Sequence, residues 1–295
     1  MVLLHQSSPH LLDRSTGALL GLVLGDAMGS PGRGRPQGQV RGHFGWITDL
    51  LALPQGAGSV SAPTRAAFHL AAHWPETPEP PRRRRQHGRL RTSITAHHLL
   101  PLGITCRSVD QLAEQLTQLA PPRTTTSSLA GAALVTGIVS AAVEAPAEAT
   151  DPAFLPAYLE MGFRAAEAVS GAGVPDAAAS VIQRSLLARE IAVRAADDED
   201  CLEQLYDLVG TSALAVESVP AAVGLLVRAE ADPTHASVLA ANLGGQASRI
   251  GALATAMAGA VRGCSAISTP WREHLETINT VCAEHVGARL LTQRA

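Results

Sequence analysis

The sequence has few aromatic side chains and no lysine. Aromatic residues make up 3% of the 295 residues, and all 23 cationic residues are arginine. A β-sandwich would need more Val, Ile, Thr and aromatic residues, so the alanine-rich, 46% hydrophobic composition favours many helices packed at short distance. The formal net charge of -3 is too small to indicate nucleic acid or an anionic membrane as a partner.

Cysteines are also few, and they lie far apart. The four of them form no CxxC pair, which argues against a zinc site or a disulfide framework. We expect all four to be reduced and buried: Cys106, Cys201, Cys264 and Cys282. The N-terminal 16 residues lack the positively charged stretch of a secretory signal. The longest apolar runs, near 129–143 and 250–261, are rich in Ala and Gly and too short to cross a bilayer. A cytoplasmic protein is therefore expected.

The hydrophobic pattern predicts an all-α protein of about eleven or twelve helices, because no segment alternates convincingly with period two. The expected helices cover about 14–27, 63–74, 108–119, 127–144, 156–170, 175–195, 199–209, 220–229, 232–243, 246–263 and a C-terminal stretch from 269. We expect one domain over 1–295, with an N-terminal tail at 1–12, a Gly-rich loop at 32–60 and a Pro/Arg-rich loop at 75–90. The four consecutive arginines of that last loop are more typical of a solvated loop than of a phosphate site.

The segment 232–263 is read as two helices that meet at a glycine pair. Asp232 is a capping residue before a proline at the first helical position, and Gly244 and Gly245 end this helix. The first turn of the next helix presents main-chain N–H groups without helical partners, so Gln246, Ser248 and Arg249 would surround a site for an anion. The alternative is a tightly packed buried helix with no ligand, since its body consists of small residues.

The first expected helix has glycines at 17, 21 and 25, which clears one face for the backbone of a neighbouring helix. Asp26 lies at its C-terminal end, where a carboxylate opposes the helix dipole. Its presence there needs a reason, such as a metal ion, an arginine or a capped loop.

Three stretches resemble one protein family. They are GALLGLVLGDAMGSP at 17–31, GTSALAVESVPAA at 210–222 and AANLGGQASRIGALATAMAGAVRG at 240–263. In this order they look like the first helix, the stretch before the final signature, and the final signature of the ADP-ribosylglycohydrolase family. The resemblance implies an orthogonal multi-helix bundle with a central cleft. Typical members bind two magnesium ions and an ADP-ribose-like group there, and hydrolyse an N- or O-glycosidic bond at the anomeric carbon of ribose.

The residues that would hold the metal differ from the family pattern. The family's Thr-Asp-Asp-Thr aligns with residues 61–64, which run from Ser61 to Thr64 without a carboxylate. Its Gly-Gly-Asp-x-Asp-Thr aligns with residues 244–249, where Arg249 ends a stretch that also lacks both aspartates. A glutamate that often follows the first helix aligns with Arg33, and His97 stands where an Asn-Gly-Ser stretch is usual. Magnesium needs oxygen ligands, mostly carboxylates, so we expect no metal and no other cofactor.

The resemblance and the residues leave two functions open. One is a metal-independent hydrolase of a nucleoside, an ADP-ribosyl group or an NAD-derived small molecule. The other is a catalytically inactive pseudoenzyme that binds an ADP-ribose-like ligand or a protein partner. The candidate catalytic residues are Asp26, Glu217 and His97. The candidate ligand-binding residues are Arg33, Asp49, Ser61, Thr64, Gly244, Gly245, Gln246, Ser248 and Arg249.

Arg249 has two interpretations. With Arg33 it would place permanent positive charge where magnesium normally lies, and guanidinium groups bind phosphate or carboxylate through two parallel bonds. The alternative is that Arg249 pairs with a remaining acid, Asp26 or Asp49, in a cleft without function. The expected partner is a small nucleoside, ADP-ribose or NAD-like molecule, not nucleic acid or a membrane, and the protein would be a monomer or homodimer.

Overall fold

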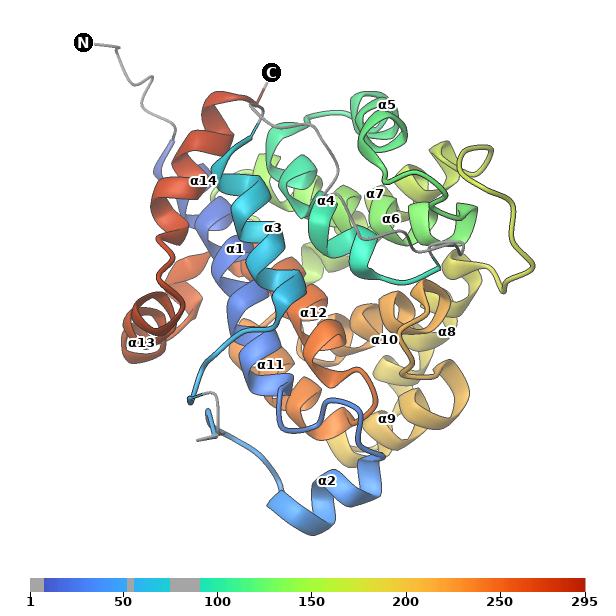
Figure 1. Ribbon diagram of the computed structural model, residues 1–295, viewed down its shortest axis with the longest axis vertical. Coiled ribbons are helices and arrows are strands. Elements are labelled where there is room, and N and C mark those ends of the chain that lie inside the picture. Colours follow the sequence, from blue (N-terminus) through green and yellow to red (C-terminus); the bar gives the residue numbers. More distant parts are fainter. Residues whose placement is uncertain (1–7, 52–55, 75–90, 295) are drawn as a thin grey trace.

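The computed structural model describes residues 8–51, 56–74 and 91–294, and within these ranges it contains helices and no strand (Figure 1). The α-helices are α1 (Pro9–Gly29), α2 (Gln37–Phe44), α3 (Ala62–Ala72), α4 (Ile94–Thr105), α5 (Val109–Leu119), α6 (Thr126–Glu144), α7 (Leu155–Ala168), α8 (Val181–Arg194), α9 (Asp198–Gln204), α10 (Ala215–Arg228), α11 (Pro233–Leu243), α12 (Ala247–Arg262), α13 (Thr269–Asn279) and α14 (Ala283–Thr292). The predicted all-α class is confirmed. The expected loop at 75–90 lies outside the described residues.

Several expected boundaries are wrong. Helix α1 begins at Pro9, inside the expected tail 1–12, because its first turn packs Leu11 and Leu12 against the core. Helix α2 lies in the segment expected to be a loop, and α4, which contains Pro101, was not among the expected helices. Helix α8 begins at Val181, six residues later than expected, and α14 is a second C-terminal helix. Burial outweighs the helix-breaking tendency of proline in α4, all of whose residues are buried.

Helices α1 and α12 form the centre of the molecule, and nearly all their residues are buried. Glycines at 17, 21, 25 and 29 of α1 face the α12 backbone, so a β-carbon at any of them would overlap main-chain atoms of α12. Gly25, for example, contacts the carbonyl of Gly251. The predicted glycine-cleared face therefore brings the C-terminal turn of α1 against the N-terminal turn of α12.

Two buried arginines donate hydrogen bonds to main-chain carbonyls at the ends of helices. Arg14 on α1 donates hydrogen bonds to the carbonyls of Ala142 (2.6 Å) and Ala145 (2.9 Å) at the end of α6. Arg294 donates to the carbonyls of Gly103 and Ile104 at the end of α4. Carbonyls in the last turn of a helix lack the regular helical donor, and a guanidinium at the negative end of a helix also offsets the cost of its own burial.

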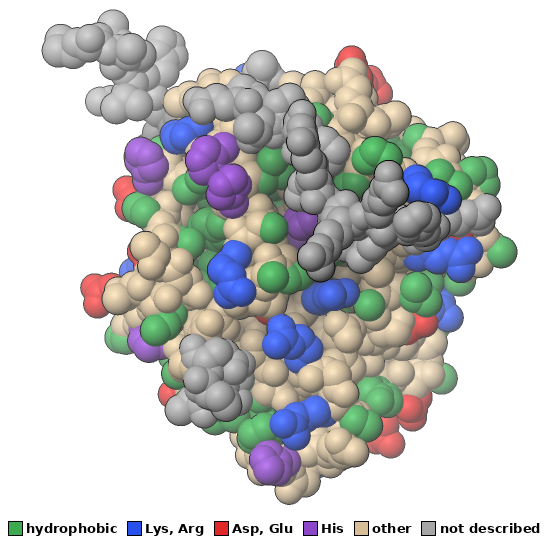
Figure 2. All heavy atoms as spheres, in the orientation of Figure 1, with side chains coloured by type: hydrophobic (Ala, Val, Ile, Leu, Met, Phe, Trp, Pro, Cys, Tyr) green, Lys and Arg blue, Asp and Glu red, His purple; other side chains and the backbone are tan. Residues whose placement is uncertain are grey.

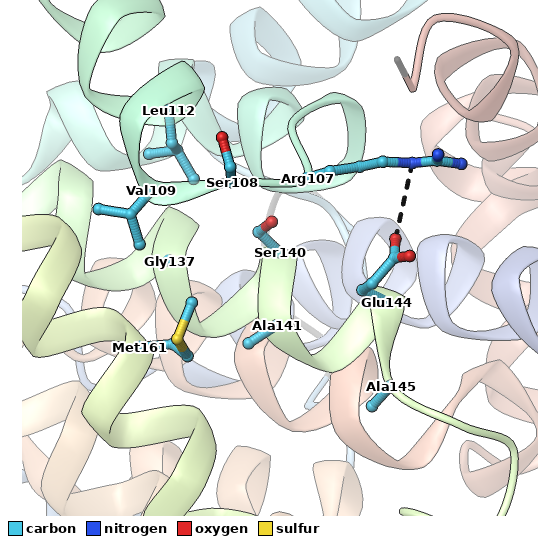
Figure 3. A pocket seen from close by; sticks show the side chains of 10 residues that line it. All are labelled: Arg107, Ser108, Val109, Leu112, Gly137, Ser140, Ala141, Glu144, Ala145 and Met161. Carbon is cyan, nitrogen blue, oxygen red and sulfur yellow. Dashed lines mark ion pairs between the residues drawn. The ribbon is translucent and has the colours of Figure 1, made fainter.

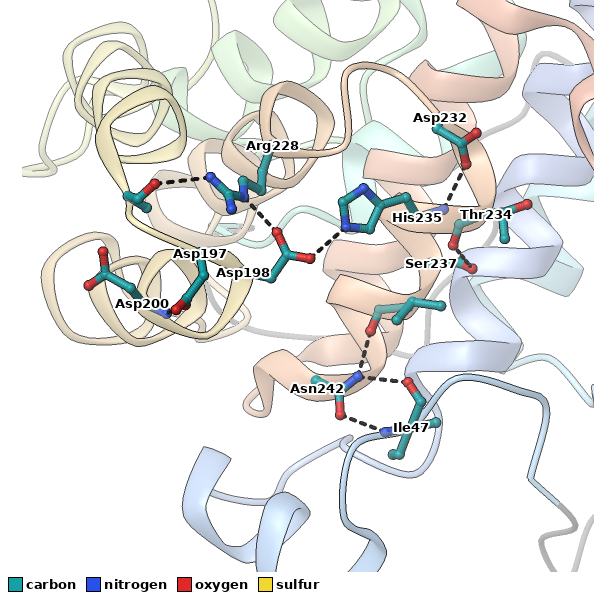
Figure 4. Close-up of polar contacts among 12 residues, drawn as sticks. Ile47, Asp197, Asp198, Asp200, Arg228, Asp232, Thr234, His235, Ser237 and Asn242 are labelled. Atoms are coloured by element: carbon teal, nitrogen blue, oxygen red, sulfur yellow. Dashed lines mark hydrogen bonds and ion pairs between the residues drawn. The ribbon is translucent and has the colours of Figure 1, made fainter.

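Polar contacts attach the segment after α2 and helix α9 to the core (Figure 4). Asn242 on α11 accepts a hydrogen bond from the Ile47 N–H (2.9 Å) and donates one to the Ile47 carbonyl (2.8 Å). Asp198 on α9 accepts hydrogen bonds from Arg228 of α10 (2.6 Å) and contacts His235 Nε2 of α11 (2.8 Å). The first contact fixes the segment after α2 to the C-terminal turn of α11, and the second ties α9 to the end of α10 and the start of α11.

The cysteines of the described residues are free. Three of them are buried, as expected, but Cys282 is exposed at the turn before α14, so the prediction of burial is wrong for that residue. Helix α6 has 19 residues and is long and apolar enough to cross a membrane, which corrects the expectation from run length. Because 78% of its apolar window is buried inside the protein, α6 fits a core helix of a soluble protein.

Candidate functional site

The loop after α1 is bonded to the glycine turn that precedes α12. The Gly34 N–H donates to the Gly245 carbonyl (2.6 Å), and the Gly245 N–H donates to the Arg35 carbonyl (2.8 Å). Gly244 and Gly245 have φ angles of 80° and 61°, and a side chain on Gly245 would overlap Thr211. Arg33 and Arg35 are exposed and are thus held on a loop beside the start of α12.

The first turn of α12 differs in part from the expected anion site. The Gln246 N–H donates to the Thr211 carbonyl (2.8 Å), so this donor is already used. Ser248 is fully buried, and its Oγ has no hydrogen-bond partner among the described residues. The N–H groups of Ala247 and Ser248 lie at the helix start, where no intrahelical acceptor exists. Arg249 is half-buried in the same turn.

Asp26 lies where α1 meets α3. Its side chain is 1% exposed, and Oδ2 accepts hydrogen bonds from the main-chain N–H and the hydroxyl of Ser61, both at 2.7 Å. Burial raises the pKa of the Asp26 carboxyl, while Ser61, Thr64 and the charge of Arg33 act in the opposite direction. The other oxygen, Oδ1, is buried and makes no hydrogen bond of standard geometry in the described part of the chain. The capped loop at Ser61 explains why a carboxylate stands at the end of α1.

His97 lies on α4, fully enclosed, between the main chains of Ser93 and Arg249. Its Nδ1 is 3.1 Å from the Ser93 carbonyl. Burial lowers the pKa of His97 to about 4; the hydrogen bond to Ser93 raises it, and the charge of Arg249 lowers it further. The imidazole is therefore neutral at pH 7. The structure brings His97 next to Arg249, a proximity that the separation of the two residues in sequence did not reveal.

Two candidates are engaged elsewhere. The Oε2 atom of Glu217 accepts a hydrogen bond from the Ser212 N–H (2.9 Å), and its side chain covers Gly210. Asp49 is exposed and accepts hydrogen bonds from its neighbour Leu50 and from Trp271 Nε1 of α13 (3.1 Å). Both carboxylates thus hold loops in place.

Sequence reasoning missed two contributors. Thr211 supplies the carbonyl that binds Gln246, and Ser93 supplies the carbonyl that binds His97. Thr211 belongs to a stretch that the family resemblance includes, so that stretch was the available signal. Ser93 carried none, because the helix that it precedes was not expected.

Positive charge is prominent on the face that contains this site. Figure 2 shows basic side chains, all of them arginine because the chain has no lysine, in a line from the region of α3 and the start of α12 down to α2. An anion that approaches this face meets cations in succession.

The residues at the α1–α12 junction do not fit two magnesium ions. Within the described ranges, no three His, Cys, Asp or Glu side chains gather closely enough to hold a metal ion. Asp26 is accompanied by the hydroxyls of Ser61 and Thr64 and by the charge of Arg33. Hydroxyl groups beside an arginine are poor ligands for a hard divalent cation.

Comparison with known proteins agrees with this architecture. The sequence model of the ADP-ribosylglycohydrolase family matches residues 7–295. "Uncharacterized protein YegU" of Escherichia coli (strain K12) is 27% identical over 319 aligned positions, which cover 90% of this chain and 93% of that protein. A solved structure described as an ADP-ribosylglycohydrolase-related protein complex is similar in fold, with a TM-score of 0.64 and 19% identity over 97% of this chain and 99% of the other. The chain belongs to the ADP-ribosylglycohydrolase family.

Proposed function

We propose that the protein binds an ADP-ribose-like anion at the α1–α12 junction through arginine, without magnesium and without turnover. The observation that carries this proposal is the pair of hydrogen bonds between the Arg33–Arg35 loop and Gly245, which holds cationic side chains beside the positive end of α12. Guanidinium groups recognise phosphate through paired N–H donors and need no metal bridge. The unpartnered hydroxyl of Ser248 adds a buried polar group in the same turn.

The candidate catalytic residues favour binding over hydrolysis. Cleavage of a glycosidic bond needs an acid that reaches the leaving group and a base that reaches a water molecule. Glu217 is bonded to the Ser212 N–H, and His97 is enclosed and already neutral. Asp26 is 1% exposed and bonded to Ser61. A substrate that reached Glu217 Oε2 or Asp26 Oδ2 would have to displace an existing hydrogen bond.

Metal-independent hydrolysis is the second candidate, and one observation favours it. The pKa of Asp26 is raised by burial, and its Oδ1 has no partner within the described residues. A carboxyl whose pKa is raised by burial is a candidate general acid toward a departing base. In that reaction the proton would pass to the leaving nitrogen or oxygen as its bond to ribose breaks, and water would supply the new bond.

Calorimetric titration of ADP-ribose into the protein, with EDTA present, tests the binding proposal. Saturable binding is expected, and Arg249→Ala should weaken it by about 1.5 to 3 kcal/mol, the range for a hydrogen bond to a charged group. Arg249→Lys should restore only part of the loss, because lysine keeps the charge without the planar fork. Arg189→Ala on the exposed face of α8 is the matched control and should bind as the parent does.

Two outcomes contradict the proposal. If Arg249→Ala lowers the melting temperature equally with and without ADP-ribose, and no ligand-induced shift occurs in either protein, Arg249 is structural. If NAD, ADP-ribosyl-arginine or a simple nucleoside releases free base or ribose in EDTA, and Asp26→Asn stops this release, the protein is a metal-independent hydrolase.

A further inference from the structure

A cavity between α5, α6 and α7 shares no lining residue with the α1–α12 junction (Figure 3). Its volume is about 220 Å³, which exceeds the roughly 150 Å³ of an engineered protein cavity that holds benzene. Gly137, Ala141 and Ala145 recur every four residues on the α6 wall and leave the space unfilled. At Gly137 helix α7 approaches closely, since a β-carbon there would meet Gly162 and Ala165.

The two ends of the cavity differ in chemistry. Figure 3 shows Val109, Leu112 and Met161 on one side, whereas Arg107 and Glu144 lie on the other. Leu112 is buried, and the side chains of Arg107 and Glu144 are about half exposed, at 54% and 51%. A cavity with this lining suits a molecule with an apolar body and one charged end.

The charged end has an excess of positive charge. Arg294 Nε donates to Glu144 Oε2 at 2.9 Å, and its other nitrogens donate to main-chain carbonyls of α4 and α6. Arg107 Nε lies 3.8 Å from the same Glu144 oxygen, beyond hydrogen-bond distance. Two guanidinium groups thus share one carboxylate. Arg294 is committed to its acceptors, whereas Arg107 pairs loosely and can turn toward an anion.

We propose that this cavity binds a small amphipathic monocarboxylate of about eight to ten non-hydrogen atoms. Its carboxylate pairs with Arg107, and its apolar body packs against Val109, Leu112 and Met161. Ser108 and Ser140 take no part, since the Ser108 hydroxyl accepts from the Gln111 N–H and the Ser140 hydroxyl donates to the Cys106 carbonyl. This site is independent of ADP-ribose binding.

Ligand-observed NMR titration with hexanoate and 1-hexanol tests the inference, because the two probes share an apolar body and differ in charge. Hexanoate is expected to saturate one site, and hexanol to bind at least about tenfold more weakly, as for a lost charge-assisted hydrogen bond. Arg107→Ala should weaken the binding of hexanoate to the affinity of hexanol and leave the affinity of hexanol unchanged. Arg107→Lys should recover part of the affinity.

Ala141→Leu fills the floor of the cavity and should abolish binding of both probes, whereas Arg189→Ala should change neither. Because Arg107 is exposed, its variants are expected to fold. They therefore test the inference even if Ala141→Leu does not fold. The inference is overturned if hexanoate does not saturate a site, if hexanoate and hexanol bind equally, or if a folded Ala141→Leu protein keeps its hexanoate affinity.

Discussion

At the scale of single residues, the three carboxylates that the sequence singled out all accept hydrogen bonds from the protein's own backbone. Glu217 binds Ser212, Asp49 binds Leu50 and Trp271, and Asp26 binds Ser61. Such pairings depend on loop geometry, which residue identity and spacing do not specify. The family resemblance made Asp26, Ser61 and Thr64 candidate site residues, and the structure brings them together. The sequence could not show that Glu217 and Asp49 hold loops.

Asp26 allows a test in which charge and hydrogen bonding are separated. Asp26→Ala should lower the free energy of unfolding by about 1 to 3 kcal/mol, because the two Ser61 donors lose their acceptor. Asp26→Asn keeps an acceptor and removes the charge that burial disfavours, so its stability at pH 7 should equal or exceed that of the parent. Denaturant unfolding measures both, and an Asn variant as unstable as the Ala variant would show that the ionised carboxylate is required.

The same substitution predicts a pH dependence. The folded pKa of Asp26 is raised above its ordinary value of 3.8, so folding takes up a proton between the two pKa values. The contribution of Asp26 to the free energy of unfolding should be complete below pH 3.8. It should be lost as the pH rises through the folded pKa. Asp26→Asn should lack this loss when both proteins are unfolded across the range.

For His97 we predict the opposite dependence of stability on pH. Its folded pKa of about 4 lies below the ordinary 6.5, so its contribution to stability is complete above pH 6.5 and is lost as the pH falls toward 4. NMR of the imidazole in the folded protein should show a ring that is neutral at pH 6.5 and becomes protonated only as the pH approaches about 4. The same resonance in urea should titrate near 6.5. A folded His97 that titrates near its ordinary value would contradict the enclosed geometry.

At the scale of helices, the proline positions explain why boundaries were misjudged. Pro220 predicts a helix start, but α10 begins at Ala215 and continues through it. The carbonyl that Pro220 leaves without an N–H partner belongs to Val216, and Arg184 of α8 donates to it at 3.3 Å. The side chain that compensates for this proline lies on another helix, so the local pattern around Pro220 carried no sign of it.

Arg184→Ala tests this compensation. Loss of the guanidinium leaves the Val216 carbonyl and the Val209 carbonyl without this donor, so the free energy of unfolding should fall by about 1 to 3 kcal/mol. Arg189→Ala on the same helix is exposed and should change stability by less than about 0.5 kcal/mol. Chemical denaturation of the two variants decides between a structural role and an ordinary surface arginine.

At the scale of the whole molecule, the glycine spacing of α1 and the small residues of α12 predicted close packing of each helix against a neighbour, and the structure shows that the two helices pack against each other. The arrangement around that pair was not predictable, because it depends on contacts between distant segments, such as the Arg33–Arg35 loop with Gly245 and α4 with α12. Those contacts join arginines, a neutral histidine and a buried carboxyl at one junction. Where the family resemblance implies metal-binding aspartates, this chain has Ala62, Pro63, Gln246 and Ser248.

We propose that arginine takes the place of magnesium in holding the ligand. ADP-ribose affinity, measured by calorimetry in EDTA and again in millimolar magnesium, tests this proposal. We predict the same dissociation constant in both conditions, or slightly weaker binding in magnesium, because the cation competes with the arginines for phosphate. Binding that appears only with magnesium, or tightens tenfold or more in its presence, would contradict it.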